Sequence, residues 1–197
     1  MANNSKTVRD FVGKKIYTLM NREESYVRAT LAKLRRGVGK HPGSMPDIWD
    51  FTLMDLPEEL LSKSGEPTSG EWAAHLSLSL FALHQQSHDI RQKPMSATGG
   101  TLGSAVRTLV IKRGEASEDA IKRRFNMVVT SDNPEELAHH LRGLIQLLRS
   151  ESISLDYPRL AEDLYWFQLP DWRDGIRLRW GQDYYSYNRK DEEKDEK

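Results

Sequence analysis

The stretch DNPEELAHHLRGLIQLLRS, residues 132–150, decides the fold class of this chain. The Asn-Pro pair at 133–134 is typical of a helix start, and the two glutamates that follow are favourable at the positive end of a helix dipole. Apolar residues then recur every three or four positions, at Leu137, Leu141, Leu144, Ile145 and Leu148. This spacing predicts an amphipathic helix whose apolar face packs against other elements.

The same helical spacing occurs along most of the chain. It predicts further helices over residues 7–20, 24–37, 71–83, 102–109, 117–128, 156–167 and 175–181. The last of these, GIRLRWG, also alternates like a strand, but no second alternating run could pair with it, and a lone strand would leave its backbone groups unsatisfied. Ser69 is expected to cap the helix that begins near Glu71. We therefore predict an all-α protein of about eight helices in two packed helical bundles.

Breaks in the pattern suggest the domain boundaries. Residues 1–114 are expected to form an N-terminal helical bundle that contains an irregular, Pro- and Gly-rich segment at 38–70. Residues 115–189 are expected to form a C-terminal helical bundle. Residues 190–197 carry almost only charged side chains and are expected to form a mobile tail.

The composition indicates a folded protein without thiol chemistry. Of the 197 residues, 38% are hydrophobic and 5 are Trp, 7 Tyr and 5 Phe, whereas Cys is absent, which excludes disulfides and thiolate catalysis. No apolar run approaches the roughly 18 residues that a membrane span needs, and the N-terminus lacks an apolar signal-peptide core. We therefore expect a soluble, cytoplasmic protein without membrane association.

The formal net charge is zero, but the charges are segregated along the chain. Residues 1–45 contain ten Lys or Arg against three acids, whereas residues 46–90 contain one Lys against eight acids. Segregation of this kind can create separate positive and negative surfaces, each attractive to a different partner. The competing interpretation is an ordinary fluctuation of charge along the sequence.

Signatures of catalysis are weak. The sequence GGTLG at 99–103 lacks the Lys-Ser/Thr ending and the preceding strand of a phosphate loop, so it is better explained as a flexible start of a helix. His84 and His88 are spaced four apart, as on one helical face, but neither a third ligand nor an HExxH pattern accompanies them. No GxSxG turn occurs. We expect no catalytic residue, no metal and no cofactor.

Basic residues form the most informative pattern. The run KLRRGVGKHPG, residues 33–43, contains more cations than a helix C-terminus needs, and AIKRRF at 120–125 places three cations between two core-facing residues. Arginine suits phosphate because its planar guanidinium forms two parallel hydrogen bonds. The alternative is that these cations form surface salt bridges with Glu115, Glu118, Glu135 and Glu136. The candidate phosphate-binding residues are Arg35, Arg36, Lys40, Arg107, Arg113, Lys122, Arg123, Arg124 and Arg142.

Several segments occur in the order found in one known family. They are LRRGVGKHPGSMPDIW, ALHQQ, GGTLGSAVRTL, the long run from IKRRF to LYWF, and IRLRWGQDYY. Together, over roughly residues 34–185, they resemble the CasB family, the small subunit of the type I-E CRISPR surveillance complex Cascade. The ordered set is specific, although no single motif is unique.

This resemblance implies a helical, non-catalytic protein that lies as two copies beside the backbone and large subunits. It implies that basic residues contact the phosphates of target DNA strands and guide RNA and stabilise the R-loop without reading sequence. The matching cations are Arg35, Arg36, Arg123, Arg124 and Arg142, whereas Lys40, Arg107, Arg113 and Lys122 are candidates by position alone. Ser104 stands where some relatives carry a basic residue. Trp166, Phe167, Trp180 and Tyr184 are expected in the core or at a bundle junction.

Two other classes of function compete with this interpretation. The protein could be a structural adaptor that joins complex subunits without a direct role in binding DNA, and the acidic segment 46–90 would suit basic protein partners. It could also be a metal-dependent nuclease built on His84 and His88, which the missing third ligand disfavours.

Overall fold

The computed structural model describes residues 2–195 of the chain, with side chains for residues 4–186. Nine α-helices occur within this range, and they are α1 (Ala2–Met20), α2 (Glu24–Leu34), α3 (Trp49–Thr52), α4 (Ser69–His84), α5 (Leu102–Arg113), α6 (Glu118–Val129), α7 (Pro134–Ser150), α8 (Tyr157–Phe167) and α9 (Pro170–Asp195). No strand lies in the described range, where Ser96 and Leu155 form an isolated bridge. The predicted all-α class is confirmed, as is a helix over 175–181.

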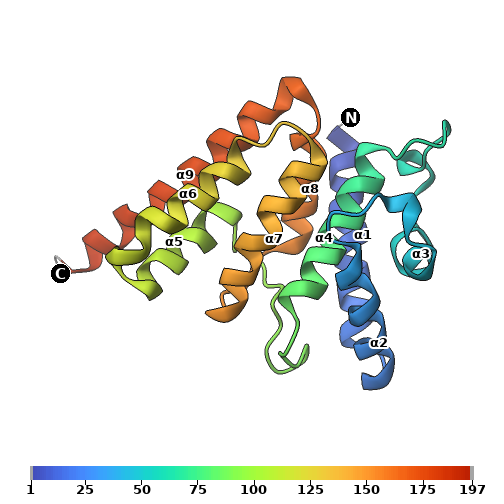
Figure 1. Ribbon diagram of the computed structural model, residues 1–197, viewed down its shortest axis with the longest axis horizontal. Coiled ribbons are helices and arrows are strands. Elements are labelled where there is room, and N and C mark those ends of the chain that lie inside the picture. Colours follow the sequence, from blue (N-terminus) through green and yellow to red (C-terminus); the bar gives the residue numbers. More distant parts are fainter. Residues whose placement is uncertain (1, 196–197) are drawn as a thin grey trace.

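Helix α4 lies at the centre of the molecule. It packs against α1, α2, α7 and α8, and Figure 1 shows it among these helices, with α3 at one end of the molecule. Almost every side chain of α4 is buried, including those of His75, Ser77 and Ser79. A helix buried on all sides is typical of the middle of a core rather than of its edge.

The start of α4 differs from the prediction in one residue. Thr68, not Ser69, is the N-cap, because its hydroxyl accepts a hydrogen bond from the Glu71 backbone N–H (3.1 Å) while the Glu71 carboxylate accepts one from the Thr68 N–H (2.8 Å). This reciprocal pair is a capping box, which needs an acid three residues after the cap. Glu71 lies three residues after Thr68 but only two after Ser69, so only Thr68 can form the capping box with it.

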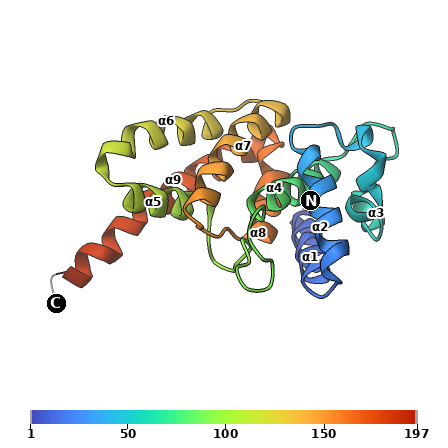
Figure 2. The ribbon, with the colours of Figure 1, turned by 60° about the horizontal axis from the view of Figure 1, so that its bottom comes forward.

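The second group of helices is built around α5 and α9. α5 packs against α9 and α6, α6 packs against α7, and Figure 2 shows α6 and α7 along one edge of the molecule. α9 also contacts α8, which itself packs on α1 and α4. The predicted division into residues 1–114 and 115–189 stays a prediction, and helices from its two sides pack against each other. The predicted tail, 190–197, overlaps the end of α9, and its side chains lie outside the described residues.

Aromatic residues close the junction between the helices. Phe167 stacks on Trp180 with ring centroids 5.4 Å apart, and Tyr184 stacks on Phe125 at 5.6 Å. Trp180 also donates a hydrogen bond to the buried carboxylate of Asp163 (2.6 Å). Phe167, Trp180 and Tyr184 are buried, as predicted, whereas Trp166 is half-buried.

The contact between α5 and α9 depends on Gly103. A Cβ atom at this position would collide with the carbonyl oxygen of Trp180 and lie 2.7 Å from the backbone nitrogen of Tyr184. Backbone atoms cannot move aside as the end of a side chain can, so α9 approaches α5 this closely only because residue 103 has no side chain.

We expect Gly103→Ala to lower the free energy of unfolding by at least about 2 kcal/mol, because α9 must shift away from α5. Gly181→Ala is the matched control, since Gly181 lies in α9 and no neighbouring atom comes within 4 Å of the place that its methyl group would occupy. That control should be neutral or stabilising by up to about 1 kcal/mol. Urea unfolding measures both, and equal stabilities of the two variants would contradict the close-approach explanation.

Candidate nucleic-acid interface

The basic segment after α2 is seated on α4. The chain continues α2 as a single 3-10 turn, Arg35–Gly37, and the carbonyl oxygen of Gly37 lies 2.9 Å from the Nε2 atom of the buried His75. A Cβ on Gly37 would come within 2.7 Å of the Ser79 hydroxyl. Gly37 is therefore required by the close approach of this turn to α4, and the turn is anchored rather than loose. Arg35 and Lys40 flank the anchored glycine.

The same segment reaches α7. Gly39 adopts a left-handed conformation (φ 74°), and a Cβ built on it would lie 4.0 Å from the Cβ of Ala138. Arg142 follows Ala138 by one helical turn, on the same side of α7. Lys40 and Arg142, a hundred residues apart in sequence, therefore belong to neighbouring parts of the surface.

A groove between α6 and α7 brings together two predicted cations. Arg124 and Arg142 line a hollow of about 230 Å³, together with Met127, His139 and His140. The Arg124 Nη1 atom lies 3.8 Å from the position of a Cβ on Gly143, so its guanidinium extends over the α7 backbone. No carboxylate is among the residues that line this groove. Two arginines with no acid beside them form a natural site for an anion.

Three of the predicted cations are ion-paired. Arg36 pairs with Asp47, Arg107 with Glu118 (3.3 Å), and Arg113 with Glu151 (2.9 Å). Arg107 is also half-buried and faces the ring of Tyr184. For these residues the salt-bridge interpretation applies, although only Glu118 was among the acids named for it.

Lys122 faces away from the α6–α7 groove. Its ammonium group lies 5.6 Å from the centre of the Tyr185 ring, and the hydrogen bond with the Tyr185 phenol raises the pKa of Lys122. Lys122 therefore contacts α9, whereas Arg124, two residues later, lies over α7.

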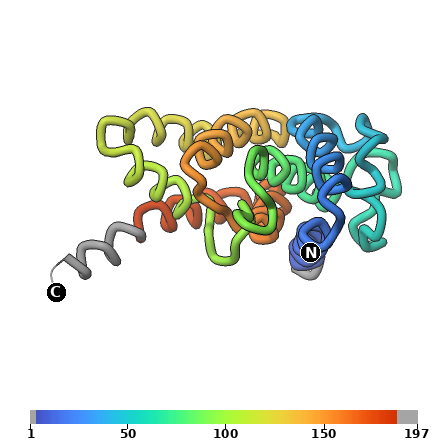
Figure 3. Tube along the Cα trace, turned by 90° about the horizontal axis from the view of Figure 1, so that it is seen from below, coloured from blue at the N-terminus to red at the C-terminus, as the bar shows by residue number. Residues whose placement is uncertain are grey.

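The other predicted cations form one surface, which we call the basic face. Its members are Arg35, Lys40, Arg123, Arg124 and Arg142. Among the side chains that the structure describes, residues 4–186, none of these five forms an ion pair or a side-chain hydrogen bond. Figure 3 shows α6, α7 and the segment after α2 along the same long edge, with α1 on the opposite side. The five cations therefore come from three segments that lie along one edge of the molecule.

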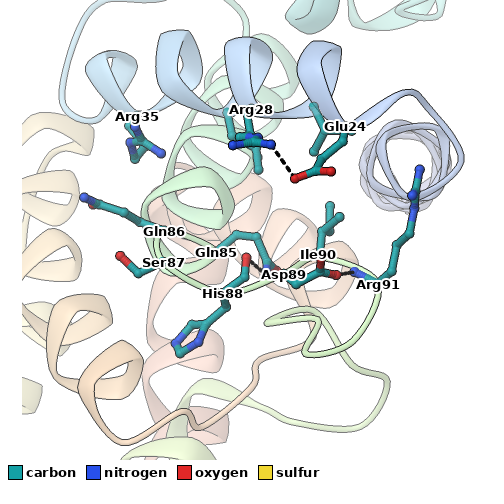
Figure 4. A pocket seen from close by; sticks show the side chains of 12 residues that line it. Glu24, Arg28, Arg35, Gln85, Gln86, Ser87, His88, Asp89, Ile90 and Arg91 are labelled. Carbon is teal, nitrogen blue, oxygen red and sulfur yellow. Dashed lines mark hydrogen bonds and ion pairs between the residues drawn. The ribbon is translucent and has the colours of Figure 1, made fainter.

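One feature near this face was not predicted from the sequence. A cavity of about 510 Å³ lies between α2 and the turn at residues 85–91, and Arg28, Arg35 and Arg91 are among its lining residues (Figure 4). The sequence indicated only a break in helical spacing at this turn. Arg28 and Arg35 are seven residues apart, about two helical turns, and this spacing across α2 and the 3-10 turn that continues it is the signal that could have placed them on one side.

His84 and His88 do not share a helical face, contrary to the prediction. α4 ends at His84, and Ser87, in a left-handed conformation (φ 69°), turns the chain before His88. His84 is fully buried with its Nδ1 atom 3.0 Å from the Tyr157 hydroxyl. Within the part of the chain that the structure describes, no group of three or more His, Cys, Asp or Glu could hold a metal ion.

We expect His84 to make stability depend on pH. Burial lowers the pKa of His84 from 6.5 to about 3, so below pH 6.5 the unfolded chain binds a proton that the folded chain does not. Stability is therefore complete above pH 6.5 and falls towards pH 3, by about 3 kcal/mol at pH 4.5 from this residue. Burial also lowers the pKa of His75, with the same sign.

Urea unfolding at pH 7.5 and pH 4.5 measures the effect. His84→Gln retains a polar partner for Tyr157 but cannot titrate, so its two unfolding free energies should differ by less than those of the unmodified protein. An identical difference in both proteins would show that His84 is not the titrating group.

The chain is similar to proteins of CRISPR systems. The family model for CRISPR-associated protein Cse2 matches residues 30–185. CasB from Thermobifida fusca is 32% identical, and the alignment covers 91% of this chain and 98% of that one with a TM-score of 0.71. Among curated proteins, no sequence matches significantly.

Two further solved structures share the fold. A Cse2-family protein from Thermus thermophilus is 22% identical, with 92% of this chain and 97% of that chain covered and a TM-score of 0.62. A chain of a CRISPR RNA-guided surveillance complex is also 22% identical, with coverages of 92% and 94% and a TM-score of 0.70.

Proposed function

The chain belongs to the CRISPR-associated Cse2 (CasB) family, and we propose that it is the non-catalytic small subunit of a cytoplasmic, type I-E RNA-guided surveillance complex whose basic face holds nucleic-acid phosphates. Its partners would be the backbone and large subunits, a second copy of itself, the target DNA strands and the guide RNA. By holding the opened DNA strands, the subunit would stabilise the R-loop.

The observation that carries this proposal is that Arg124 and Arg142 line the same groove. The groove contains no carboxylate that would neutralise them, and both side chains are exposed. Guanidinium groups bond phosphate oxygens bidentately, and releasing counterions from a nucleic acid favours binding by such cations. The ligand of this groove is therefore expected to be a phosphodiester backbone.

The arrangement supports binding without sequence specificity. Phosphate contacts position a protein on nucleic acid but carry no sequence information, which in an RNA-guided system comes from base pairing with the guide. The cations come from the anchored segment after α2 and from two packed helices, so the backbone that carries them is already ordered before binding.

The adaptor function remains the second candidate, and one observation favours it. Exposed acids cluster in sequence around α3 and the segment that follows, among them Asp50, Glu58 and Glu66. Figure 1 shows α3 at the end of the molecule remote from α5 and α6. An acidic end of this kind suits a basic protein surface, and it leaves the basic face available.

We expect Arg124→Ala combined with Arg142→Ala to weaken binding of the isolated chain to DNA of any sequence. Removing two phosphate contacts should reduce the slope of log affinity against log salt concentration by about 2. A fluorescence-anisotropy titration of labelled duplex and single-stranded DNA at several salt concentrations measures both quantities.

Lys6→Ala combined with Lys14→Ala is the matched control. It removes the same charge from exposed positions of α1, on the side of the molecule opposite the basic face. In this control, the slope of log affinity against log salt concentration should stay close to that of the unmodified protein. If both double variants lose the same amount, net charge alone governs binding; if neither loses affinity while the complex still assembles, the adaptor function is favoured.

A further inference from the structure

The cavity between α2 and the turn at 85–91 has the size and walls of a ligand site. Its volume of about 510 Å³ falls within the range of about 300–1,000 Å³ found for small-molecule sites. Figure 4 shows Arg28 and Arg35 extending from α2 on one side, with Gln86 and Ser87 on the other. The two walls are therefore contributed by segments that are about fifty residues apart in the sequence.

The turn that forms the second wall is held firmly. The buried Gln85 side chain donates to the carbonyl oxygens of His88 and Lys93 (both 3.1 Å) and accepts from the Met95 backbone N–H (2.8 Å). Arg91 donates to the carbonyl oxygens of Met20 (3.1 Å) and Arg22 (2.5 Å) at the end of α1. The cavity is therefore preformed, and a ligand would not have to order its walls.

The acids of the cavity are already satisfied. Glu24 pairs with Arg28 at 2.6 Å. The Asp89 carboxylate accepts hydrogen bonds from the backbone N–H groups of Arg91 (2.8 Å) and Gln92 (2.9 Å). Arg35 has no ion-pair partner among the described side chains, so it is the cation available to an anionic ligand.

The remaining walls combine apolar surface with a hydrogen-bonding group. Val27, Leu31 and Ile90 contribute apolar side chains that belong to the core. The Gln86 side-chain oxygen accepts a hydrogen bond from Arg149 (2.6 Å), which leaves its amide N–H groups to donate to a ligand. Apolar walls, a free amide and one free cation together fit a flat heterocycle attached to a phosphate.

We propose that this cavity takes an unpaired nucleobase of a single-stranded nucleic acid, with the adjacent phosphate bonded by Arg35. The proposal rests on the proposed function, because Arg35 belongs to the basic face and a backbone that follows that face would reach the cavity. The base lies against Val27, Leu31 and Ile90 and beside the guanidinium of Arg28, which Glu24 holds and which offers a planar stacking surface. Bases of an intact duplex are paired and stacked, and they cannot enter.

The absence of cysteine allows the cavity to be blocked after folding. Ser87→Cys places a thiol in the cavity wall, and Ser64→Cys places one on the exposed segment before α4 as the matched control. Each folded variant is compared with itself before and after reaction with N-ethylmaleimide, which adds bulk without charge. The probes are an oligothymidylate of about 20 nucleotides, long enough to exceed the usual site size of a single-strand binding protein, and an abasic oligonucleotide of the same length and charge.

Before modification, oligothymidylate should bind about tenfold more tightly than the abasic strand, as expected for one or two stacked bases. Modified Ser87→Cys should lose this preference while its affinity for the abasic strand is unchanged, and modified Ser64→Cys should retain it. Equal binding of the two probes before modification, a preference that survives blocking at residue 87, or an equal loss for both probes would overturn the base site.

The two proposals fail in different ways. Arg124→Ala with Arg142→Ala should weaken the binding of both probes by the same factor and leave the preference for oligothymidylate over the abasic strand intact. Loss of this preference with unchanged binding of the abasic strand therefore concerns the cavity alone. If neither probe binds, the proposed function fails and the base site fails with it. As a measurement on the unmodified protein, photocrosslinking of a 5-iodouracil oligonucleotide should label residues 27–35 or 85–91; labelling elsewhere only would also overturn the proposal.

Discussion

The burial of α4 is the constraint on which the rest of the structure depends. Since the helix is enclosed by α1, α2, α7 and α8, its polar side chains must find partners inside the protein or incur a desolvation cost. His75 reaches the turn after α2, His84 reaches Tyr157 of α8, and Gln85 organises the turn that follows. Each of these bonds fixes a different neighbouring segment, so the buried helix and its C-cap residue position the turn after α2, the start of α8 and the turn at 85–95.

The basic face follows from this constraint. Arg35 and Lys40 lie on either side of Gly37, whose carbonyl group bonds His75 and whose missing side chain lets the turn touch Ser79. The glycines of this segment do not make it flexible; Gly37 allows a close approach, and Gly39 supplies a left-handed turn beside α7. A polyanion would therefore meet cations that the core has already positioned, which lowers the entropic cost of binding.

Local sequence patterns identified eight of the nine described helices, missing only the short α3 in the segment expected to be irregular, but they did not identify the pairing of charges. Apolar spacing identified α7 and, once an unpaired strand was rejected, the segment 175–181, because both depend on neighbours within one helix. Whether an arginine is free depends on residues distant in sequence: Arg36 meets Asp47 through the 3-10 turns that follow α2, and Arg113 meets Glu151 at the end of α7. The cavity beside Arg35 likewise requires two separate segments, which no local pattern encodes.

This division of the arginines explains how a chain with zero net charge can present a positive surface. Arg107 and Arg113 pair with carboxylates and join α5 to α6 and to the end of α7, whereas Arg124 and Arg142 line a groove without a carboxylate. Several exposed acids without an ion-pair partner among the described side chains, including Asp50, Glu58 and Glu66, lie around α3 and the segment that follows it, at the other end of the molecule. Opposite charges separated in this way orient a protein in an electric field. The proposed binding of nucleic acid at α6 and α7 and the alternative proposal of a basic protein partner near α3 are therefore compatible, because they would use opposite ends of the molecule.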